Sequence, residues 1–229
     1  MSYVIQPAAI PFLPIHGSDA LFPVHRIYCI GRNYAEHAKE MGAEPVSRAQ
    51  PVFFLKPADA IVPGGGDVPY PPATKELHHE VEMVVALSRG GREIDAARAL
   101  DCVFGYGVGL DLTRRDLQAV AKAKSLPWDI AKSFDASAPV SALRPASEIG
   151  HPSRAQLSLR VNGELRQQTD IEAMIFPVSE IIAELSKMFE LKPGDLIFTG
   201  TPAGVGLLAR GDAFRAELKD IATLEGRII

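Results

Sequence analysis

Short runs of apolar residues, bounded by glycine, proline and polar residues, make up most of the chain. Runs of about four to eight residues between turn residues are typical of strands. Strands are therefore predicted at residues 26–31, 51–57, 81–87 and 103–113. The last run contains three glycines, which predicts that another backbone or a ligand lies close to it.

A second kind of stretch has the spacing of short helices. Asn33 is expected to cap the first of these helices and Gly42 to end it. Thr113 and Asp116 have the spacing of a capping box at the start of the second helix, although Glu or Gln is the usual residue at the position of Asp116. Helices are predicted at residues 33–42, 113–124 and 179–189.

The turns divide these elements without regular alternation between strand and helix. Asn162-Gly163 predicts a hairpin with a type I′ turn, and residues 62–72 are expected to be a loop. A strand after Gly194 runs into a glycine-rich loop, and the tail from Gly211 has the pattern of closing strands. Strands outnumber helices, so we expect an α+β fold with a mixed, curled sheet instead of a Rossmann-type domain.

The 229 residues are enough for one large domain or one domain with an added arm. Residues 1–24 have the prolines of an extended N-terminal arm. The expected organisation is therefore an arm at 1–24 followed by a single domain at 25–229.

Composition excludes several classes of protein. The net charge of −4 argues against nucleic acid as the main partner, because phosphate binding requires a basic face. No apolar run reaches the roughly 18 residues that a membrane helix needs. The N-terminus is a poor signal peptide, and Cys29 and Cys102 stand alone among apolar residues. We therefore expect a cytoplasmic protein with no membrane or nucleic-acid partner.

Two carboxylates interrupt the most apolar strand. Glu80 and Glu82 project to the same face, with Cα atoms about 7 Å apart. Two buried carboxylates at this range repel each other, and a hard divalent cation such as Mg²⁺ satisfies both. Asp111, at the end of the glycine-rich strand, is the best third ligand. We expect no internal cation in this cluster.

Two alternatives remain open at this stretch. One is an edge strand with a solvated acidic face. The other is a zinc site that uses His78 or His79, since imidazole favours zinc. Adjacent strand residues point to opposite faces, so at most one of the two histidines joins the glutamates directly.

His37 and Glu40 lie three residues apart on a predicted helix and therefore share a face. A carboxylate beside an imidazole raises its basicity, as a general base for water requires. An exposed helical ion pair is the alternative. Lys132, among apolar residues, is interpreted either as a cation beside an oxyanion or as a surface lysine. Thr201 lies in a glycine-rich loop that forms either an anion-binding nest or a tight turn.

In combination, these motifs resemble the fumarylacetoacetate hydrolase superfamily, specifically its acylpyruvase and fumarylpyruvate hydrolase branch. The similar stretches follow the family's order over residues 28–206. They are IGRNYAEHAKEMG, FFLKP, LHHEVEMVV, GYGVGLDLTRRDLQ, PWDIAKSFD, VNGELRQ and LKPGDLIFTGTPAGVG. The resemblance implies a mixed β-sandwich roll with short flanking helices, and usually a homodimer.

The resemblance also implies a role for each candidate residue. It makes Glu80, Glu82 and Asp111 ligands of Mg²⁺ or Mn²⁺. His37 and Glu40 fall on the water-activating pair, and Lys132 falls beside the reacting carbonyl. The pyruvate portion of the substrate is held by groups that correspond to Arg115, Gln118 and Thr201.

The implied activity is metal-dependent hydrolysis of a C–C bond in a 2,4-diketo acid, with 3-fumarylpyruvate giving fumarate and pyruvate. The far carboxylate of a fumaryl group requires a cation, for which Arg32 and Lys124 are candidates that no spacing argument separates. The alternatives are an oxaloacetate decarboxylase or another acylpyruvate hydrolase of the same superfamily. A non-catalytic module that binds cations or small acids is a third reading, and the His37–Glu40 pair argues against it.

Overall fold

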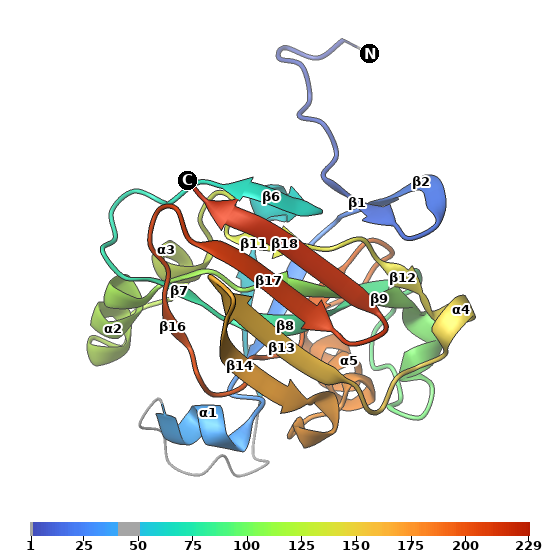
Figure 1. Cartoon of the computed structure of the whole chain (residues 1–229). Helices are drawn as coiled ribbons and strands as arrows, with labels where there is room; N and C mark the ends of the chain where they lie inside the picture. Colours follow the sequence, from blue (N-terminus) through green and yellow to red (C-terminus); the bar gives the residue numbers. More distant parts are fainter. Residues whose placement is uncertain (1, 41–50) are drawn as a thin grey trace.

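The structure is a computed structural model that describes residues 2–40 and 51–229. Its largest element is an eight-stranded sheet in the order β4-β3-β15-β8-β9-β11-β5, with β12 paired to β9 (Figure 1). Parallel and antiparallel pairs both occur in it. Its strands are β3 (Ile27–Gly31), β4 (Val52–Lys56), β5 (Ile61–Pro63), β8 (Val81–Leu87), β9 (Val103–Leu110), β11 (Ala138–Val140), β12 (Arg144–Pro145) and β15 (Leu196–Phe198).

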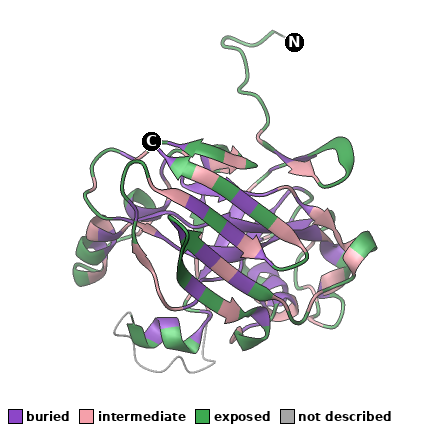
Figure 2. Cartoon of the chain, in the orientation of Figure 1, coloured by how far each residue is buried: buried purple, intermediate pink, exposed green. Residues whose placement is uncertain are grey.

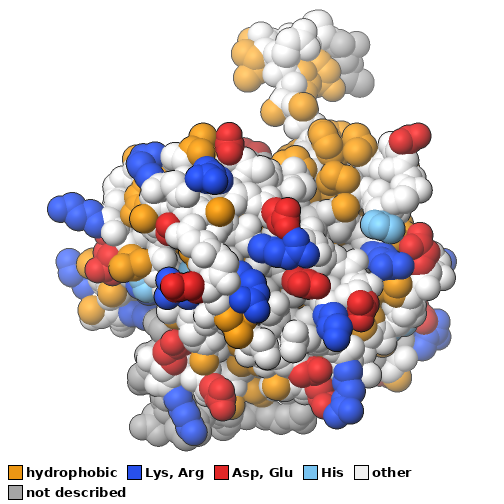
Figure 3. Space-filling model, in the orientation of Figure 1, with side chains coloured by type: hydrophobic (Ala, Val, Ile, Leu, Met, Phe, Trp, Pro, Cys, Tyr) orange, Lys and Arg blue, Asp and Glu red, His pale blue; other side chains and the backbone are white. Residues whose placement is uncertain are grey.

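A five-stranded sheet lies across one face of the large sheet (Figure 1). Its order is β14-β13-β17-β18-β6. On the face shown in Figure 3, Lys and Arg side chains are interspersed with Asp and Glu. The strands are β6 (Gly65–Val68), β13 (Gln156–Val161), β14 (Glu164–Asp170), β17 (Ala213–Leu218) and β18 (Ala222–Ile228).

The remaining elements are short and surround the two sheets. A three-stranded sheet consists of β7 (Leu77–His79), β10 (Thr113–Arg114) and β16 (Gly206–Leu207). The α-helices are α1 (Ala35–Glu40), α2 (Arg115–Ala123), α3 (Asp129–Lys132), α4 (Ala146–Ile149) and α5 (Val178–Met188); 3-10 turns occupy Ala58–Ala60, Ala99–Cys102 and Ile171–Ala173. None of the helices in the described part of the chain is long and apolar enough to cross a membrane. The predicted α+β class with a mixed, curled sheet is confirmed.

The N-terminal segment combines an extended stretch with a hairpin. Residues 2–10 project from the body, with Val4 104% and Ile5 82% exposed (Figures 1 and 3). Antiparallel pairing then joins β1 (Phe12–Ile15) to β2 (Ser18–Pro23). Leu13 and Phe22 of this hairpin pack into a hydrophobic cluster beneath the large sheet.

Alternation along β8 divides the core into two clusters. Val81, Met83 and Val85 pack toward the five-stranded sheet, whereas Val84 belongs to the cluster that includes the β1–β2 hairpin. Glu82 shares the face of Val84 because strand side chains alternate. The whole strand is buried, and Figure 2 shows buried residues alternating with more exposed ones along the five-stranded sheet in front of it. Glu82 is therefore an interior carboxylate, and the solvated edge-strand alternative is wrong.

The glycine-rich strand β9 does approach another backbone, as predicted. A Cβ added at Gly105 would lie 2.3 Å from the backbone oxygen of Arg144. At Gly109 it would meet Pro139 O and Val84 Cγ2, each at 3.0 Å. These glycines let the chain of β11 and β12 cover β9, which leaves Asp111 at the end of a strand that is buried at every residue except Phe104.

Local signals misassigned both helix caps. Asn33 does not cap α1; its side chain donates to Thr199 O at 2.8 Å and Phe176 O at 3.0 Å, and accepts from Phe176 N at 2.7 Å. The expected stop at Gly42 lies outside the described residues. The capping box at Thr113 is also wrong, because this hydroxyl donates to Asp111 O at 3.0 Å and the strand β10 precedes the helix.

The turn predictions had mixed outcomes. The hairpin at Asn162-Gly163 is confirmed, with φ of 52° and 82° at the two turn residues, as a type I′ turn requires. The loop expected at 62–72 is wrong at residues 62–63, which end strand β5, and over Gly65–Val68, which is strand β6. Strand β6 forms because it pairs with the C-terminal strand β18, and its glycine-rich local sequence does not predict this pairing.

Candidate active site

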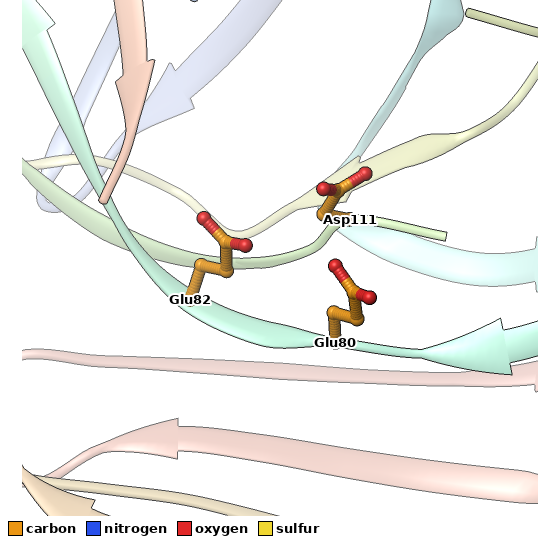
Figure 4. Close-up of side chains that lie close together, drawn as sticks. All are labelled: Glu80, Glu82 and Asp111. Carbon is orange, nitrogen blue, oxygen red and sulfur yellow. The ribbon is translucent and has the colours of Figure 1, made fainter. Parts of the chain in front are cut away.

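Three carboxylates lie close together where β8 begins beside the end of β9. Glu80 directly precedes β8 and Asp111 directly follows β9, and the two strands pair antiparallel, so these residues face each other. The backbone confirms this register, since Asp111 N donates to Glu80 O at 2.8 Å. One oxygen from each of Glu80, Glu82 and Asp111 lies within 4.8 Å of the others (Figure 4). The predicted grouping of these residues is therefore present.

Buried cations surround this cluster, contrary to the expectation that it lacks one. Lys132 Nζ lies 2.7 Å from Glu80 Oε2 and 2.5 Å from Asp111 Oδ2. Lys56 Nζ lies 2.9 Å from Asp111 Oδ1, and Arg115 pairs with Glu80 Oε1. The interior carboxylates are tolerated because opposite charges accompany them into the core.

These contacts shift the pKa values of the two glutamates in opposite directions. Burial alone would raise the pKa of Glu80, but Lys132 and Arg115 hold it well below its usual range. Burial raises the pKa of Glu82 well above its usual range, and the charges of Asp111 and Glu80 raise it further. Glu82 has a backbone donor in Gly200 N at 2.7 Å, whereas no ion pair to it occurs among the described residues. Glu82 is thus the carboxylate with the most to gain from an added positive charge.

The donor set fits a hard divalent cation. Asp111 Oδ1 is buried and accepts no hydrogen bond within the described chain, although Lys56 Nζ lies 2.9 Å away at an unfavourable angle. All the grouped donors are carboxylate oxygens, which Mg²⁺ and Mn²⁺ prefer. Neither histidine of the zinc alternative joins the group; His79 Nδ1 instead lies 2.9 Å from Gln167 Oε1.

The His37–Glu40 pair lies on α1. His37 Nδ1 is 3.3 Å from Glu40 Oε2, and Gly204 N donates to Glu40 Oε1 at 3.1 Å. His37 is 7% exposed, so the alternative of an exposed ion pair fails for the imidazole. Burial lowers the pKa of His37, and Glu80 and Glu40 only partly oppose this shift. The imidazole is therefore neutral near pH 7, the form that accepts a proton.

The glycine-rich loop binds the site's own acidic groups. Gly200 N donates to Glu82 and Gly204 N to Glu40. Gly200 has φ of +94°, and a Cβ there would lie 2.7 Å from Asn33 Cβ, so only glycine suits this position. Thr201 is buried and its hydroxyl accepts from Gln167 Nε2 at 2.8 Å. The loop therefore joins the carboxylate cluster to α1, in addition to presenting Thr201.

One pocket contains most of the predicted residues. Arg115 donates to Gln118 Oε1 at 2.5 Å as well as pairing with Glu80, which orients both side chains. Lys124, expected as a partner for the far carboxylate, is exposed and does not line this pocket. The pocket is lined by Ile30, Gly31, Arg32, His37, Phe54, Glu80, Glu82, Asp111, Arg115, Gln118, Lys122, Trp128, Lys132 and Thr201.

Two buried residues that contact the site, Lys56 and Gln167, were given no role from the sequence. Lys56 is 2% exposed and bound to Asp111; its only signal was a lysine inside the apolar run FFLKP. Gln167 connects His79, Val81 N and Thr201, yet it lies on the largely exposed strand β14 and carries no local signal.

Comparisons with known proteins agree with this geometry. The family model described as fumarylacetoacetate (FAA) hydrolase C-terminal matches residues 26–229. The mitochondrial oxaloacetate tautomerase FAHD1 of Rattus norvegicus is 46% identical over 202 residues, which cover 88% of this chain and 90% of that protein. The mitochondrial oxaloacetate decarboxylase of Dictyostelium discoideum is 40% identical, with 86% and 90% covered.

A solved structure extends the likeness to the whole chain. The crystal structure of fumarylpyruvate hydrolase from Pseudomonas aeruginosa in complex with Mn²⁺ and pyruvate superposes with a TM-score of 0.97. It is 48% identical, and the match covers 100% of this chain and 99% of that one. The likeness therefore extends beyond the fold to the amino-acid sequence.

Proposed function

Since the chain belongs to the fumarylacetoacetate hydrolase superfamily, in its acylpyruvase branch, we propose that it hydrolyses a C–C bond of a 2,4-diketo acid. The proposed substrate is 3-fumarylpyruvate, which gives fumarate and pyruvate. One observation carries the proposal: the neutral His37 and the Lys132 ammonium face the same pocket as the carboxylate cluster. Binding a small acid needs no base, so this arrangement favours a catalyst over a binding module.

His37 is the proposed acceptor of the proton from water. Glu40 lies against Nδ1 at 3.3 Å, which leaves Nε2 for the water molecule. The water oxygen bonds to C4 of the substrate while the electron pair of the C4=O π bond moves to the carbonyl oxygen, which becomes an oxyanion. When this C=O bond re-forms, the C3–C4 bond breaks and its electron pair passes to C3 as an enolate. The proton held on His37 then goes to C3, which completes pyruvate. Glu40 stabilises the imidazolium that exists between these two steps.

Lys132 is the proposed stabiliser of the oxyanion at C4. An ammonium has three N–H donors, and Glu80 and Asp111 accept two of them, which leaves one for the oxyanion. Asp111 and Glu80 raise the pKa of Lys132 despite its burial, so it stays charged during the reaction. Arg115, with Gln118 and Thr201 of the same pocket, is proposed to bind the pyruvate portion of the substrate.

The proposed cofactor is Mg²⁺ or Mn²⁺, held by Glu80, Glu82 and Asp111. When bound, the ion supplies positive charge for the 2-keto acid end of the substrate. The Mn²⁺ bound with pyruvate in the Pseudomonas aeruginosa enzyme supports this assignment. From the family resemblance we also propose a homodimer, and from the two free, buried cysteines we propose a cytoplasmic location.

A second candidate function is proton transfer or decarboxylation on oxaloacetate. The names of two relatives, an oxaloacetate tautomerase and an oxaloacetate decarboxylase, favour it specifically. Both reactions need a bound 2-keto acid and an enolate, and neither needs an attacking water. The carboxylate cluster with Lys132 suffices for the loss of CO₂. Hydrolysis and tautomerisation also need a group that accepts a proton, which the His37–Glu40 pair supplies.

Product analysis tests the choice between these functions. The protein with Mg²⁺ or Mn²⁺ is given 3-fumarylpyruvate, acetylpyruvate or oxaloacetate, and loss of near-UV diketone absorbance is followed. We expect fumarate and pyruvate in equal amounts from the first substrate, with kcat/KM above that for oxaloacetate. Turnover of oxaloacetate with no cleavage of either acylpyruvate would reject the hydrolase and establish the second function.

A further inference from the structure

Two cations of the pocket have no carboxylate partner in the part of the chain that the structure describes. Lys132 and Arg115 pair with the carboxylate cluster, as the neighbouring Lys56 does. Arg32 and Lys122 line the same pocket, and neither forms an ion pair with the described residues. Each lining carboxylate already has a cation or, for Glu82, a backbone amide. This side of the pocket therefore carries positive charge that an anionic ligand can offset.

Trp128 places the two cations on one wall. Lys122 Nζ lies 5.4 Å from the centroid of the Trp128 ring, a cation–π arrangement that holds the ammonium in place. A Cβ added at Gly31, the residue before Arg32, would lie 3.8 Å from Trp128 Cζ3. The indole thus lies against the backbone that carries Arg32 while its ring supports Lys122.

The backbone at Arg32 gives an independent indication. Arg32 has φ of +62°, in the left-handed region that a bulky side chain rarely adopts. Such strain persists where the surrounding structure imposes it, and it concentrates at ligand sites. The neighbouring Asn33 imposes it here, through its three hydrogen bonds to Phe176 and Thr199.

We propose that Arg32 and Lys122 form a subsite for the far carboxylate of a dicarboxylic 2,4-diketo acid, with Trp128 as its wall. The inference rests on the proposed function and specifies its substrate class: an acyl group that ends in a carboxylate. Lys122 replaces Lys124, which the sequence had offered and which lies outside the pocket. Burial and the charges of Arg115 and Arg32 lower the pKa of Lys122, and a bound carboxylate relieves this repulsion.

A purely structural role for Lys122 is the competing explanation. Lys122 lies in the last turn of α2, where a cation stabilises the partial negative charge of the helix end. Such a role predicts a lower melting temperature in a Lys122 variant and an equal effect on all substrates. The subsite predicts a change in the preference between substrates with and without the far carboxylate.

Substrate preference is measured first. The ratio of kcat/KM for 3-fumarylpyruvate to that for acetylpyruvate is compared between the wild type and Lys122→Met, Arg32→Met and Lys124→Met. Each of the first two variants should lower the ratio about 10- to 100-fold, the usual worth of a hydrogen bond between charged groups. Lys122→Arg should restore most of the ratio. Lys124→Met removes a nearby exposed charge and should leave it unchanged; a fall as large as that in Lys122→Met would overturn the subsite.

A binding measurement separates the subsite from the proposed reaction. 2-Oxoheptanedioate and 2-oxoheptanoate share a 2-keto acid head and a chain length, differ in the far carboxylate, and lack the C4 carbonyl that hydrolysis needs. Calorimetry on the Mn²⁺-loaded protein should show a preference for the dioate that Lys122→Met and Arg32→Met each reduce about tenfold. This result would uphold the subsite even if the protein cleaved no acylpyruvate. Equal affinities for the two acids in the wild type would reject it, whatever the reaction.

Discussion

Glu80, Glu82 and Asp111 extend from the buried, paired strands β8 and β9, whereas His37 and Glu40 lie on the six-residue helix α1. Each member of the first group is fixed by the sheet and by buried ion pairs or a backbone amide. Glu40, in contrast, is held by His37 and by Gly204 N, and its side chain is 33% exposed.

In the proposed mechanism, charge and proton transfer are therefore supplied by regions of different rigidity. The carboxylate cluster lies in a low-dielectric interior where a misplaced charge is expensive, so its geometry must be set by the fold. A helix of six residues is too short to be stable alone and depends on its contacts for its position. Substitutions in the two regions should therefore have different signatures.

Glu82→Gln should have the largest effect of any substitution in the carboxylate cluster. It keeps the shape and removes the carboxylate with the most raised pKa, which needs an added cation most. Activity should fall by about 10⁴-fold, since Lewis-acid stabilisation contributes several kcal/mol. Calorimetry should show weakened Mn²⁺ binding. Glu76→Gln, an exposed carboxylate in the same segment, is the matched control. Full activity of the wild type in excess EDTA, with no metal by elemental analysis, would contradict the metal assignment.

Glu40→Gln removes the negative charge from the His37–Glu40 pair on α1 and should leave metal binding intact. Hydrolysis of an acylpyruvate should fall by about 10³-fold, within the usual worth of a positioned base. Any decarboxylation of oxaloacetate should fall much less, because it needs no attacking water. Glu36→Gln, exposed on the same helix, is the control. If both activities dropped by the same factor, the pair would order the pocket and would not activate water.

Lys132→Met tests the buried cation that pairs with Glu80 and Asp111 and faces the pocket. It should lower kcat by about 10²- to 10³-fold, the typical loss of one oxyanion donor. Lys56→Met deletes the other ammonium on Asp111, but Lys56 does not line the pocket. The second change should therefore lower the free energy of unfolding by about 3 kcal/mol, with a smaller effect on kcat. A tenfold rise in KM with unchanged kcat in Lys132→Met would make Lys132 a binding residue.

The smallest expected effect is a shift in pH dependence. A base must be neutral to act, so kcat/KM should fall as pH drops through the pKa of His37. Burial lowers this pKa from 6.5, and the acid limb should lie below that value. Glu40 raises the same pKa by its charge and hydrogen bond, so the limb in Glu40→Gln should move to still lower pH. Profiles at saturating Mn²⁺ measure both; an unmoved limb would assign it to another group.

The same contrast explains what the sequence predicted. The carboxylate cluster was predictable because strand periodicity places Glu80 and Glu82 on one face and a short β8–β9 pairing brings Asp111 opposite. His37 and Glu40 were predictable because helical spacing is also a local property. The first arrangement depends on the geometry of two neighbouring strands and the second on the geometry of one helix.

Features set by distant segments were missed. Asn33 has the chemistry of a helix cap, but hydrogen bonds to Thr199 and Phe176 take its side chain elsewhere. Lys56 ends β4, which three strands separate from β9 in the large sheet, so its ion pair with Asp111 depends on the tertiary fold. Strand β6 is glycine-rich and exists because β18, from the other end of the chain, pairs with it. In each case tertiary contacts overrode local preference.

The position of the proposed base on α1 bears on how proteins of this kind diverge after gene duplication. Within the described chain, neither hydrophobic cluster includes a residue of α1, so changes there should cost less folding free energy than changes in the core. Changes at Glu80, Glu82 or Asp111 strand a buried lysine or arginine and are purged by selection on stability. Inherited variation should therefore alter the reaction type sooner than metal binding, one ancestral scaffold yielding hydrolases, tautomerases and decarboxylases.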